Sequence, residues 1–576
     1  MKAASLFMVL ALAKAAALAG HSLPHSWWSP IAYLWQDAAL ALAFAIVESA
    51  LASRPRIVWA IYGALAAYAA VNVPVVRVLS TPLTWAMWRA ARGPLADSIW
   101  YYATPANVAA AVVIGASAAI MPRLLRRAPR RLLIGGWAMC VALGPVAASR
   151  ADTRGLERNA WTALASTALP QLSARASSDW KRVGFERVSD DRLMRFRGLT
   201  PGWNVILVSL ESTAAQYLGL YGAQPDVMPN LTRLAQSGIV FDRAYAAYPE
   251  SIKGLYSVLC SAYPAFDVAV EAYGTAACRS LPAVLSERGY ATALFHSGRF
   301  MYLGMEAIVR DRGYDVLEDA GDIGGNHQSS FGVDEPSTVA RMLRWIDARR
   351  SGEPFFLTYL PIAGHHPYES STPGPFSEHR EIDRYRNALH DGDAALGVLM
   401  QGLESRGLWT HTLWVVFGDH GEAFGQHEGN YGHTFNLYDE NVHVPMLVAA
   451  PGAVRQLVRS NRVVSLVDVA PTVLDLAGLA PPEMYQGESM LAAGARMALF
   501  FADYSRGLLG LRDGSLKLIY TIDSQRSSLF DLDADPAERV NVSDRYPAQV
   551  RWYIENLRGW SAAQKDRLLA TSEPVK

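Results

Sequence analysis

Hydrophobic residues fill the first 150 positions in long runs, whereas beyond position 200 they recur as short runs separated by mixed segments. A helix needs about 20 apolar residues to cross the hydrocarbon core of a membrane, and five of the long runs approach that length. We predict five membrane-spanning helices, at residues 3–19, 31–52, 57–79, 106–121 and 132–148. Lys2 and the alanine-rich end of the first run are also typical of a signal peptide, but four more spans follow it.

Arginines gather in two of the short loops between these spans and indicate how the chain is oriented. Cytoplasmic loops of membrane proteins are enriched in Lys and Arg. The two loops hold Arg54 and Arg56, and Arg123, Arg126, Arg127, Arg130 and Arg131. The N-terminus is then inside and everything after Ala148 outside. We therefore expect a multi-pass protein of the inner (plasma) membrane, with the domain that follows in the periplasm or outside the cell.

After Trp203 short apolar runs alternate with helical stretches. This alternation predicts an α/β domain with a mostly parallel sheet and helices on both faces. We divide the chain into transmembrane helices (1–148), a partly helical juxtamembrane linker (149–200), a main α/β domain (201–495) and a C-terminal subdomain (496–576). The balance of 53 basic and 53 acidic residues argues against a nucleic-acid partner.

Two predicted strands end in residues that suit a metal ion. The run at 412–417 leads to Asp419 and His420, and the run at 204–210 leads to Glu211. Open α/β sheets hold their ligands at the carboxyl ends of strands. A carboxylate and an imidazole together favour a divalent cation, Zn or Mn rather than Ca or Mg, with Glu211 as the third ligand. The alternative for Glu211 is a helix N-terminal residue stabilised by the helix dipole.

Ser251 precedes a helix-like run at 255–259. A hydroxyl in that position is usually a helix cap, but it is also where a nucleophile gains from the dipole and the exposed amides. Lys253, two residues later, could hold a phosphoryl or sulfuryl oxygen. Cys260 and Cys278 follow, and their two open alternatives are a disulfide or two buried free thiols.

Histidines recur at predicted strand ends and in the loop after Asp419. His296 and His365 follow strands at 291–295 and 355–360, while His427 and His433 lie beyond the Asp-His pair. A single histidine of this kind is more often structural than functional. Several loops that present one together favour a shared site with the metal ligands.

Together with further motifs, these residues resemble the sulfatase branch of the alkaline-phosphatase superfamily over roughly residues 202–557. The matching residues and motifs are Glu211 at its strand end, Ser251 with Cys260-Ser261, Phe295-His296, His365 to Tyr368, Asp419-His420-Gly421-Glu422, Asp468 to Thr472, Leu511 to Gly514 and Leu529 to Leu532. The resemblance implies an alkaline-phosphatase-like α/β/α fold with a small C-terminal subdomain of antiparallel strands and a last helix.

The resemblance also implies roles for the residues. Glu211, Asp419 and His420 would bind the cation together with the nucleophile Ser251, which is the fourth ligand. His296 and His365 would hold the anionic head of the substrate, and His433 would assist the leaving group. We also assign His427 to substrate binding, as we do Lys253 from its position near Ser251.

Two departures from sulfatases indicate a subfamily. Sulfatases carry Cys/Ser-x-Pro-x-Arg at the nucleophile, the motif that is oxidised to formylglycine, whereas here Ser251-Ile252-Lys253-Gly254-Leu255 has neither the Pro nor the Arg. Glu211-Ser212 also replaces their paired Asp ligands. Both features, with the predicted spans, are similar to the membrane-bound lipoteichoic-acid synthases and phosphoethanolamine transferases.

The predicted function is transfer or hydrolysis of phospho-headgroups, of the phosphoethanolamine or phosphoglycerol type, at the outer face of the inner membrane. The expected donor is a membrane lipid, and the acceptor is an envelope glycan or lipid. The alternatives are a membrane-bound sulfatase and a structural or transport-associated protein that has lost catalysis. The sequence leaves the donor, the acceptor, the metal and the oligomeric state open.

Overall fold

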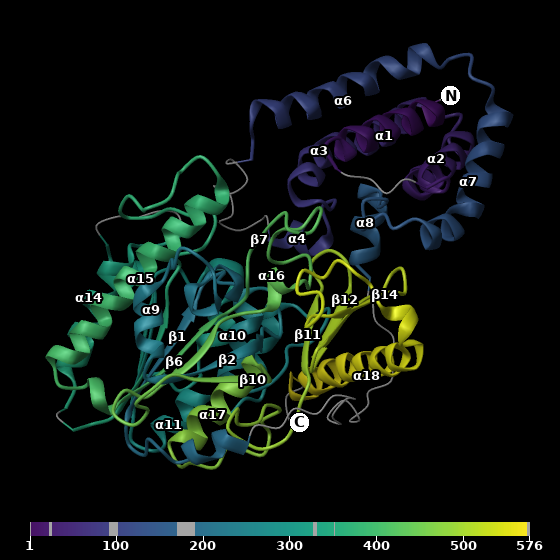
Figure 1. Cartoon of the computed structure of the whole chain (residues 1–576). Helices are drawn as coiled ribbons and strands as arrows, with labels where there is room; N and C mark the ends of the chain where they lie inside the picture. The colour runs from purple at the N-terminus through teal and green to yellow at the C-terminus, as the bar shows by residue number, and fades with distance from the viewer. Residues whose placement is uncertain are drawn as a thin grey trace. The chain divides into compact units, whose positions relative to one another are not determined.

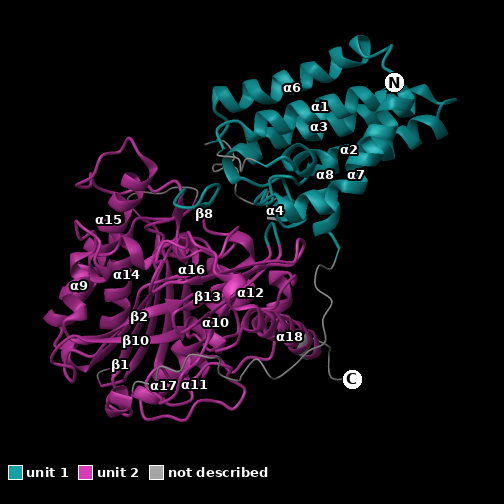
Figure 2. Cartoon of the chain, turned by 45° about the vertical axis from the view of Figure 1, so that its right-hand side comes forward, with its two compact units in different colours: residues 1–171, 425–431, 504–506 teal, residues 172–424, 432–503, 507–576 magenta. Residues whose placement is uncertain are grey.

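The computed structural model describes residues 2–21, 26–90, 102–169, 191–325, 331–350 and 352–572. The chain divides into two compact units (Figure 2). Unit 1 comprises Met1–Gln171 with the short segments Gly425–Tyr431 and Tyr504–Arg506, and unit 2 comprises the remaining residues.

Unit 1 is a set of long apolar helices (Figure 1). All five predicted spans are helical, and four are long and apolar enough to cross a membrane: α2 (Ser29–Ala50), α3 (Pro55–Leu79), α6 (Pro105–Leu124) and α7 (Arg130–Arg150). The first, α1 (Lys2–Leu18), has 17 residues and so measures only about 25 Å at 1.5 Å per residue. The predicted long apolar helices are confirmed, and within the described residues four of them have the length and composition of a membrane span.

Small residues allow these helices to approach closely. A Cβ atom on Gly144 of α7 would lie 2.6 Å from the ring of Trp35 in α2, so only glycine fits against this tryptophan. Ala38 and Ala41 of α2 are fully buried in the same unit. Because lipid provides no hydrophobic force between helices, such close contacts are what favours their association.

A buried lysine in α1 connects this helix to residues 156–158, which follow α7. Lys14 Nζ in α1 donates hydrogen bonds of 2.8–3.1 Å to the carbonyls of residues 156–158 and lies 3.7 Å from Asp37 Oδ2 in α2. Asn159 donates a further hydrogen bond to Asp37. Buried charges are costly unless they are paired, and here each has partners.

The predicted linker at 149–200 is in part an ordered piece of unit 1. Residues Ala160–Thr167 form α8, and the Trp161 indole in this helix donates to the Leu65 carbonyl of α3. Within the predicted linker, residues 170–190 lie outside the described part of the chain.

Unit 2 contains, among the described residues, an eight-stranded mixed sheet in the order β10-β2-β9-β6-β1-β5-β3-β4. Its pairs are parallel except where β9 meets β2 and β6. The strands are β1 (Asn204–Leu210), β2 (Gly238–Tyr245), β3 (Ala291–His296), β4 (Val316–Glu318), β5 (Phe355–Leu360), β6 (Thr412–Gly418), β9 (Met446–Ala449) and β10 (Val458–Ser465). The strands predicted at 204–210, 291–295, 355–360 and 412–417 are confirmed.

Helices cover both faces of this sheet, as predicted (Figure 1). Alternate residues of β1 point to opposite faces, with Ile206 and Val208 in one core and Val205 and Leu207 in the other. The first core includes α9 (Pro229–Ala235), α14 (Glu335–Ala348) and α15 (Glu381–Ser405), and the second includes α10 (Ser251–Cys260), α11 (Leu281–Ser286) and α17 (Val469–Leu476). Fully buried strands of this kind require apolar residues on both sides.

The C-terminal part of unit 2 adds a four-stranded antiparallel sheet and a last helix. The elements are β11 (Ala498–Ala502), β12 (Leu508–Asp513), β13 (Leu516–Thr521), β14 (Arg526–Asp531) and α18 (Pro547–Ser572). Trp560 of α18 is fully buried in one core with Leu499 and Leu518 of the sheet. The expected small C-terminal subdomain is confirmed.

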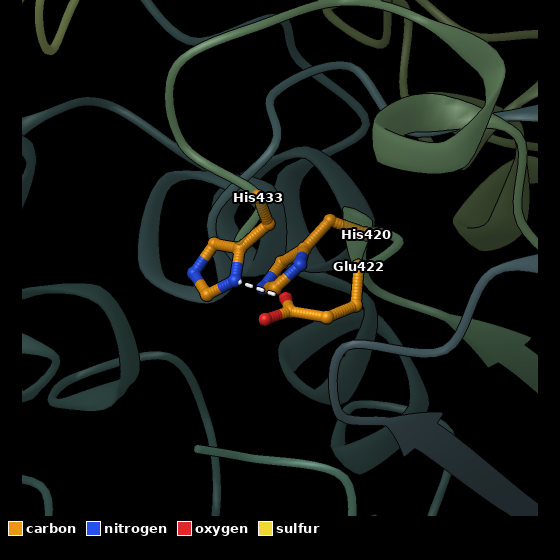
Figure 3. Close-up of side chains that lie close together, drawn as sticks. All are labelled: His420, Glu422 and His433. Carbon is orange, nitrogen blue, oxygen red and sulfur yellow. Dashed lines mark hydrogen bonds and ion pairs between the residues drawn. The ribbon is translucent and has the colours of Figure 1, made fainter. Parts of the chain in front are cut away.

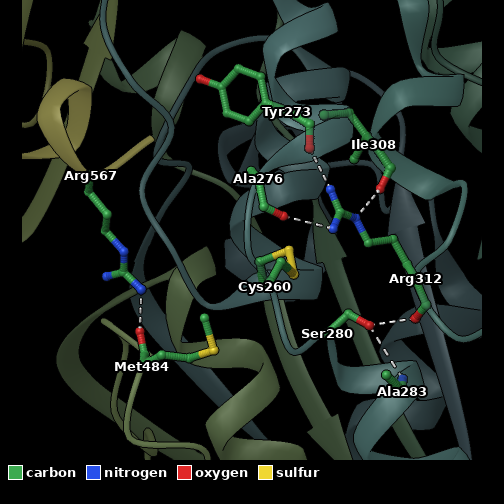
Figure 4. Close-up of a disulfide and its surroundings, with 10 residues drawn as sticks. Cys260, Tyr273, Ala276, Ser280, Ala283, Ile308, Arg312, Met484 and Arg567 are labelled. Atoms are coloured by element: carbon green, nitrogen blue, oxygen red, sulfur yellow. Dashed lines mark hydrogen bonds between the residues drawn. A yellow bond between two sulfur atoms is a disulfide. The ribbon is translucent and has the colours of Figure 1, made fainter. Parts of the chain in front are cut away.

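Cys260 and Cys278 form a disulfide, which decides between the two alternatives left open by the sequence (Figure 4). Cys260 is the last residue of α10, so the bond fixes the end of that helix to the loop before α11. Nearby, the buried Arg312 guanidinium donates to the carbonyls of Tyr273, Ala276 and Ile308. Disulfides persist in oxidising compartments, which agrees with an exported domain.

Candidate active site

The pairing of β1 with β6 brings the predicted metal ligands to one edge of the sheet. The two strands are parallel neighbours in register, with Leu210 opposite Gly418. The residues that follow, Glu211 on one strand and Asp419 and His420 on the other, therefore lie side by side. Residues that are far apart in the sequence meet here because parallel strands end at the same edge.

The side chains of Glu211, Asp419 and His420 can together hold a divalent cation. Their ligand atoms lie within 4.8 Å of one another, and all three residues are buried. His420 Nε2 is 3.6 Å from Glu211 Oε1 and 3.5 Å from Asp419 Oδ2. Two buried carboxylates and an imidazole form a donor set suited to a hard or borderline ion, and a cation would offset the cost of burying their charge.

Backbone groups around this cluster orient its ligands. Asp419 Oδ1 accepts hydrogen bonds from the amides of Ser212 (2.9 Å) and His420 (2.7 Å). His420 Nδ1 lies 3.0 Å from the Gly421 carbonyl, to which it can only donate. In the neutral imidazole this leaves the lone pair on Nε2, the atom that faces the two carboxylates.

Ser251 joins the cluster from the start of α10. Its Oγ donates to Glu211 Oε2 at 2.9 Å and lies 3.2 Å from His420 Nε2. The helix begins at Ser251 itself, and the capping role belongs to Glu250, whose side chain accepts from the Lys253 amide. The serine hydroxyl is thus released from capping and faces the metal ligands.

Lys253 forms an ion pair that the sequence did not indicate. Its side chain is buried, and Nζ lies 3.1 Å from Asp503 Oδ2 and over the ring of Tyr248. Asp503 also accepts from the Tyr248 hydroxyl at 2.6 Å. This ion pair engages the Lys253 ammonium group and fixes the first turn of α10. The predicted contact of Lys253 with substrate stays a prediction.

His433 stacks beside the metal ligand His420 and bonds to a residue that sequence reasoning did not single out (Figure 3). The two imidazole rings are 4.0 Å apart, and His433 Nδ1 is 2.6 Å from Glu422 Oε2. Tyr368 donates to the other oxygen of Glu422 at 2.5 Å. Glu422 stands within the quoted Asp-His-Gly-Glu motif, but only the fold shows which histidine it contacts.

Burial shifts the proton affinities of this pair in opposite directions. It raises the pKa of Glu422 to about 7 and, as the largest cause, lowers the pKa of His433 to about 4. Both shifts favour neutral groups, so the hydrogen bond between them can hold or pass one proton at neutral pH.

His296 and His365 reach the site from β3 and β5. His296 lines a small cavity together with Glu211, Ser251 and Asp419, and its Nδ1 lies 2.9 Å from the Leu360 carbonyl. His365 lies in a neighbouring cleft, where its ring packs 4.7 Å from that of Phe331. The structure therefore brings both histidines to the region where the sequence placed them.

His427 lies in the segment Gly425–Tyr431, which belongs to unit 1, whereas the cluster around Ser251 belongs to unit 2. The predicted contact of His427 with substrate stays a prediction.

Two family models match the region that holds this site. The model described as Sulfatase matches residues 203–479, and the model described as N-sulphoglucosamine sulphohydrolase, C-terminal, matches residues 426–556. The chain carries a sulfatase-family domain. Its N-terminal apolar helices fit membrane anchoring of that domain.

Curated relatives of the sulfatase domain include both ester hydrolases and a synthase. Arylsulfatase K of Bos taurus is 30% identical over 229 residues, which cover 35% of this chain and 42% of the relative. Arylsulfatase K of Canis lupus familiaris is 24% identical, and the match covers 63% of this chain and 84% of the relative. Lipoteichoic acid synthase 2 of Bacillus subtilis (strain 168) is 23% identical over 49% of this chain and 46% of the relative. The match thus spans less than half the length of the bovine and bacterial relatives.

Solved structures confirm the fold of the sulfatase domain. A protein of the alkaline phosphatase superfamily from Vibrio parahaemolyticus has a TM-score of 0.54 at 19% identity, covering 69% of this chain and 95% of that protein. A lipoteichoic acid synthase from Listeria monocytogenes has a TM-score of 0.50 at 16% identity, covering 66% and 98%. The predicted alkaline-phosphatase-like fold is therefore confirmed.

Cation affinity should depend on the proton of Asp419. Burial raises the pKa of Asp419 to about 7, and a cation needs the ionised form, so binding displaces a proton below that pH. We expect the dissociation constant for Zn²⁺ or Mn²⁺ to rise about tenfold for each pH unit below 7 and to level off above it. Chelator competition between pH 5.5 and 8 measures the dissociation constant. In Asp419→Asn we expect weaker cation binding that no longer depends on pH. An affinity that is independent of pH would contradict the assignment.

Proposed function

We propose that this protein transfers or hydrolyses phospho-headgroups of membrane lipids at the outer face of the inner membrane, through a covalent intermediate on Ser251. The observation that carries the proposal is the position of the Ser251 hydroxyl, 2.9 Å from Glu211 and 3.2 Å from His420. A serine without the Pro and Arg of the formylglycine motif favours direct attack by the hydroxyl oxygen. The candidate membrane helices and the similarity to lipoteichoic acid synthases support a lipid donor.

A divalent cation held by Glu211, Asp419 and His420 would supply the positive charge that favours the ionised serine oxygen and an anionic ester. Ser251 is positioned for this at the N-terminus of a ten-residue helix, whose dipole favours the same charges. Zn and Mn remain our candidates for the ion.

Before the first step the Ser251 hydroxyl loses its proton to solvent. The resulting Oγ alkoxide attacks the phosphorus of the headgroup diester, and the bond from phosphorus to the lipid oxygen breaks. His433 protonates the departing alkoxide, while Glu422 holds its Nδ1 in place. In the second step an acceptor hydroxyl or water gives its proton to His433 and attacks phosphorus, which releases Ser251. The proposed acceptor is an envelope glycan or lipid, and His296 and His365 hold the anionic head.

Ser251→Ala tests the covalent step. We expect a folded, cation-loaded protein whose turnover of a phosphodiester falls by several orders of magnitude, roughly the loss seen when a covalent nucleophile is removed. The matched control is Ser212→Ala, because Ser212 Oγ also donates to Glu211, at 3.0 Å, but to its other oxygen. Trapping with a labelled phosphodiester should place the label on Ser251. Label on Ser212 or Thr213, or an active Ser251→Ala protein, would refute the mechanism.

Reporter fusions test on which side of the membrane the catalytic domain lies. A reporter that is active only in the periplasm should be silent when fused after Pro129 and active when fused after Ala151, because the arginine-rich loop that contains Pro129 stays in the cytoplasm. The reverse pattern would place the catalytic domain inside the cell and exclude transfer at the outer face.

A second candidate function is hydrolysis of sulfate esters, which the similarity to arylsulfatase K favours. This activity would require either unmodified Ser251 as nucleophile or its oxidation to formylglycine by an unusual route. Mass spectrometry of the peptide that contains Ser251 separates the two chemistries. We expect an unmodified serine, and a mass deficit of about 2 Da, the loss of two hydrogens in oxidation of an alcohol to an aldehyde, would favour the sulfatase.

A further inference from the structure

Glu335 is a buried carboxylate that neither the motifs nor the proposed mechanism uses. It is the first residue of α14, with Asp334 as the helix cap, and it is only 4% exposed. A carboxylate in the first turn of a helix is stabilised by the dipole, yet its burial still demands hydrogen-bond donors. The identity of those donors indicates what the residue does.

Four donors converge on this carboxylate. Oε2 accepts from the hydroxyls of Ser297, at 2.5 Å, and Tyr359. Oε1 accepts from two consecutive backbone amides, those of Ile362 (2.8 Å) and Ala363 (3.1 Å). An ionised carboxylate can accept all four, whereas a hydroxyl side chain has too few lone pairs.

These donors flank the two histidines that face the substrate. Ser297 follows His296 directly, and both residues bond to the Leu360 carbonyl, through the Ser297 amide (3.0 Å) and His296 Nδ1 (2.9 Å). On the other loop, the Ile362 carbonyl accepts from the His365 amide at 2.9 Å. Glu335 thus connects the end of β3 with the loop after β5, each of which presents one histidine.

We propose that Glu335 is the positioning residue that holds His296 and His365 at the spacing required to bind the anionic head of the substrate. The proposal rests on the proposed function only in the role given to these two histidines. Glu335 acts through them and does not touch the substrate. Glu335 belongs to a 14-residue helix that packs on the sheet, so it has a fixed position. Its hydrogen bonds therefore restrict the movement of the loops after β3 and β5.

The test compares Glu335→Ala with Asp393→Ala in the full-length, zinc-loaded protein in detergent. Asp393 is a matched control because it is also buried and also accepts from two consecutive amides, those of Asn230 (2.8 Å) and Leu231 (2.9 Å), but these belong to α9. The probe is inorganic phosphate, whose dissociation constant is measured by calorimetry. Turnover of bis(p-nitrophenyl) phosphate is measured separately.

We expect Glu335→Ala to weaken phosphate binding about 10- to 100-fold at unchanged zinc content, the usual range for residues that orient ligating side chains. Asp393→Ala should lower the melting temperature but leave the dissociation constant within about twofold, since it touches neither histidine loop. Glu335→Gln should stay within about threefold of the wild type, because its amide oxygen can face the backbone amides and its NH₂ can face the hydroxyls.

Unchanged phosphate binding in Glu335→Ala, or an equal loss in Asp393→Ala, would overturn the proposal. If Glu335→Ala does not fold, Ser297→Ala replaces it, and we expect at least about threefold weaker binding from loss of the bond beside His296; no change would again overturn the assignment. Phosphate binding without turnover of the diester would refute the proposed function alone. If the wild type shows neither phosphate binding nor diester turnover, the role of Glu335 and the proposed function are both refuted.

Discussion

Two buried carboxylates and a buried imidazole share one edge of the central sheet, and the free-energy cost of burying charge there constrains the groups around Glu211 and Asp419. Such a group is tolerated only with donors, protons or a cation to balance it. The raised pKa of Asp419 shows the effect of burial, and the amides of Ser212 and His420 offset only part of it. A cation at this site would take the place of a proton on Asp419, and Ser251 Oγ lies beside it, 2.9 Å from Glu211 Oε2.

The proposed nucleophile, Ser251, depends on a helix that is fixed at both ends. At the first turn Lys253 pairs with Asp503, and at the last residue Cys260 is bonded to Cys278. Helix α10 is buried along its length, so its first residue cannot shift without disturbing the core. Precise placement of this kind matters because a misplacement of about 1 Å can cost a hundredfold in rate. The same logic applies to Glu335, which bonds to Ser297 at the end of β3 and to the amides of Ile362 and Ala363 in the loop after β5.

Much of the fold could be predicted from the sequence because its signals are local. The apolar runs before residue 150 and the buried strands at 204–210 and 412–417 were recognisable by length and pattern alone. Contacts between distant residues could not be predicted. The partly helical linker predicted at 149–200 gave no sign that Trp161 packs against α3. Sequence spacing from Ser251 gave no sign that Lys253 pairs with Asp503, 250 residues away.

By itself the sequence determined the membrane helices, the alternation of strands and helices, and the residue types gathered at strand ends, since each of these depends on neighbours within one element. The tertiary structure alone decided that Cys260 pairs with Cys278, that Glu422 holds His433, and that Glu335 joins the loops of His296 and His365. The physical reason is that a hydrogen bond forms between atoms about 3 Å apart, and only the folded chain brings such atoms together. For Glu335 this depends on the pairing of β5 with β3, which places the end of β3 beside the loop after β5.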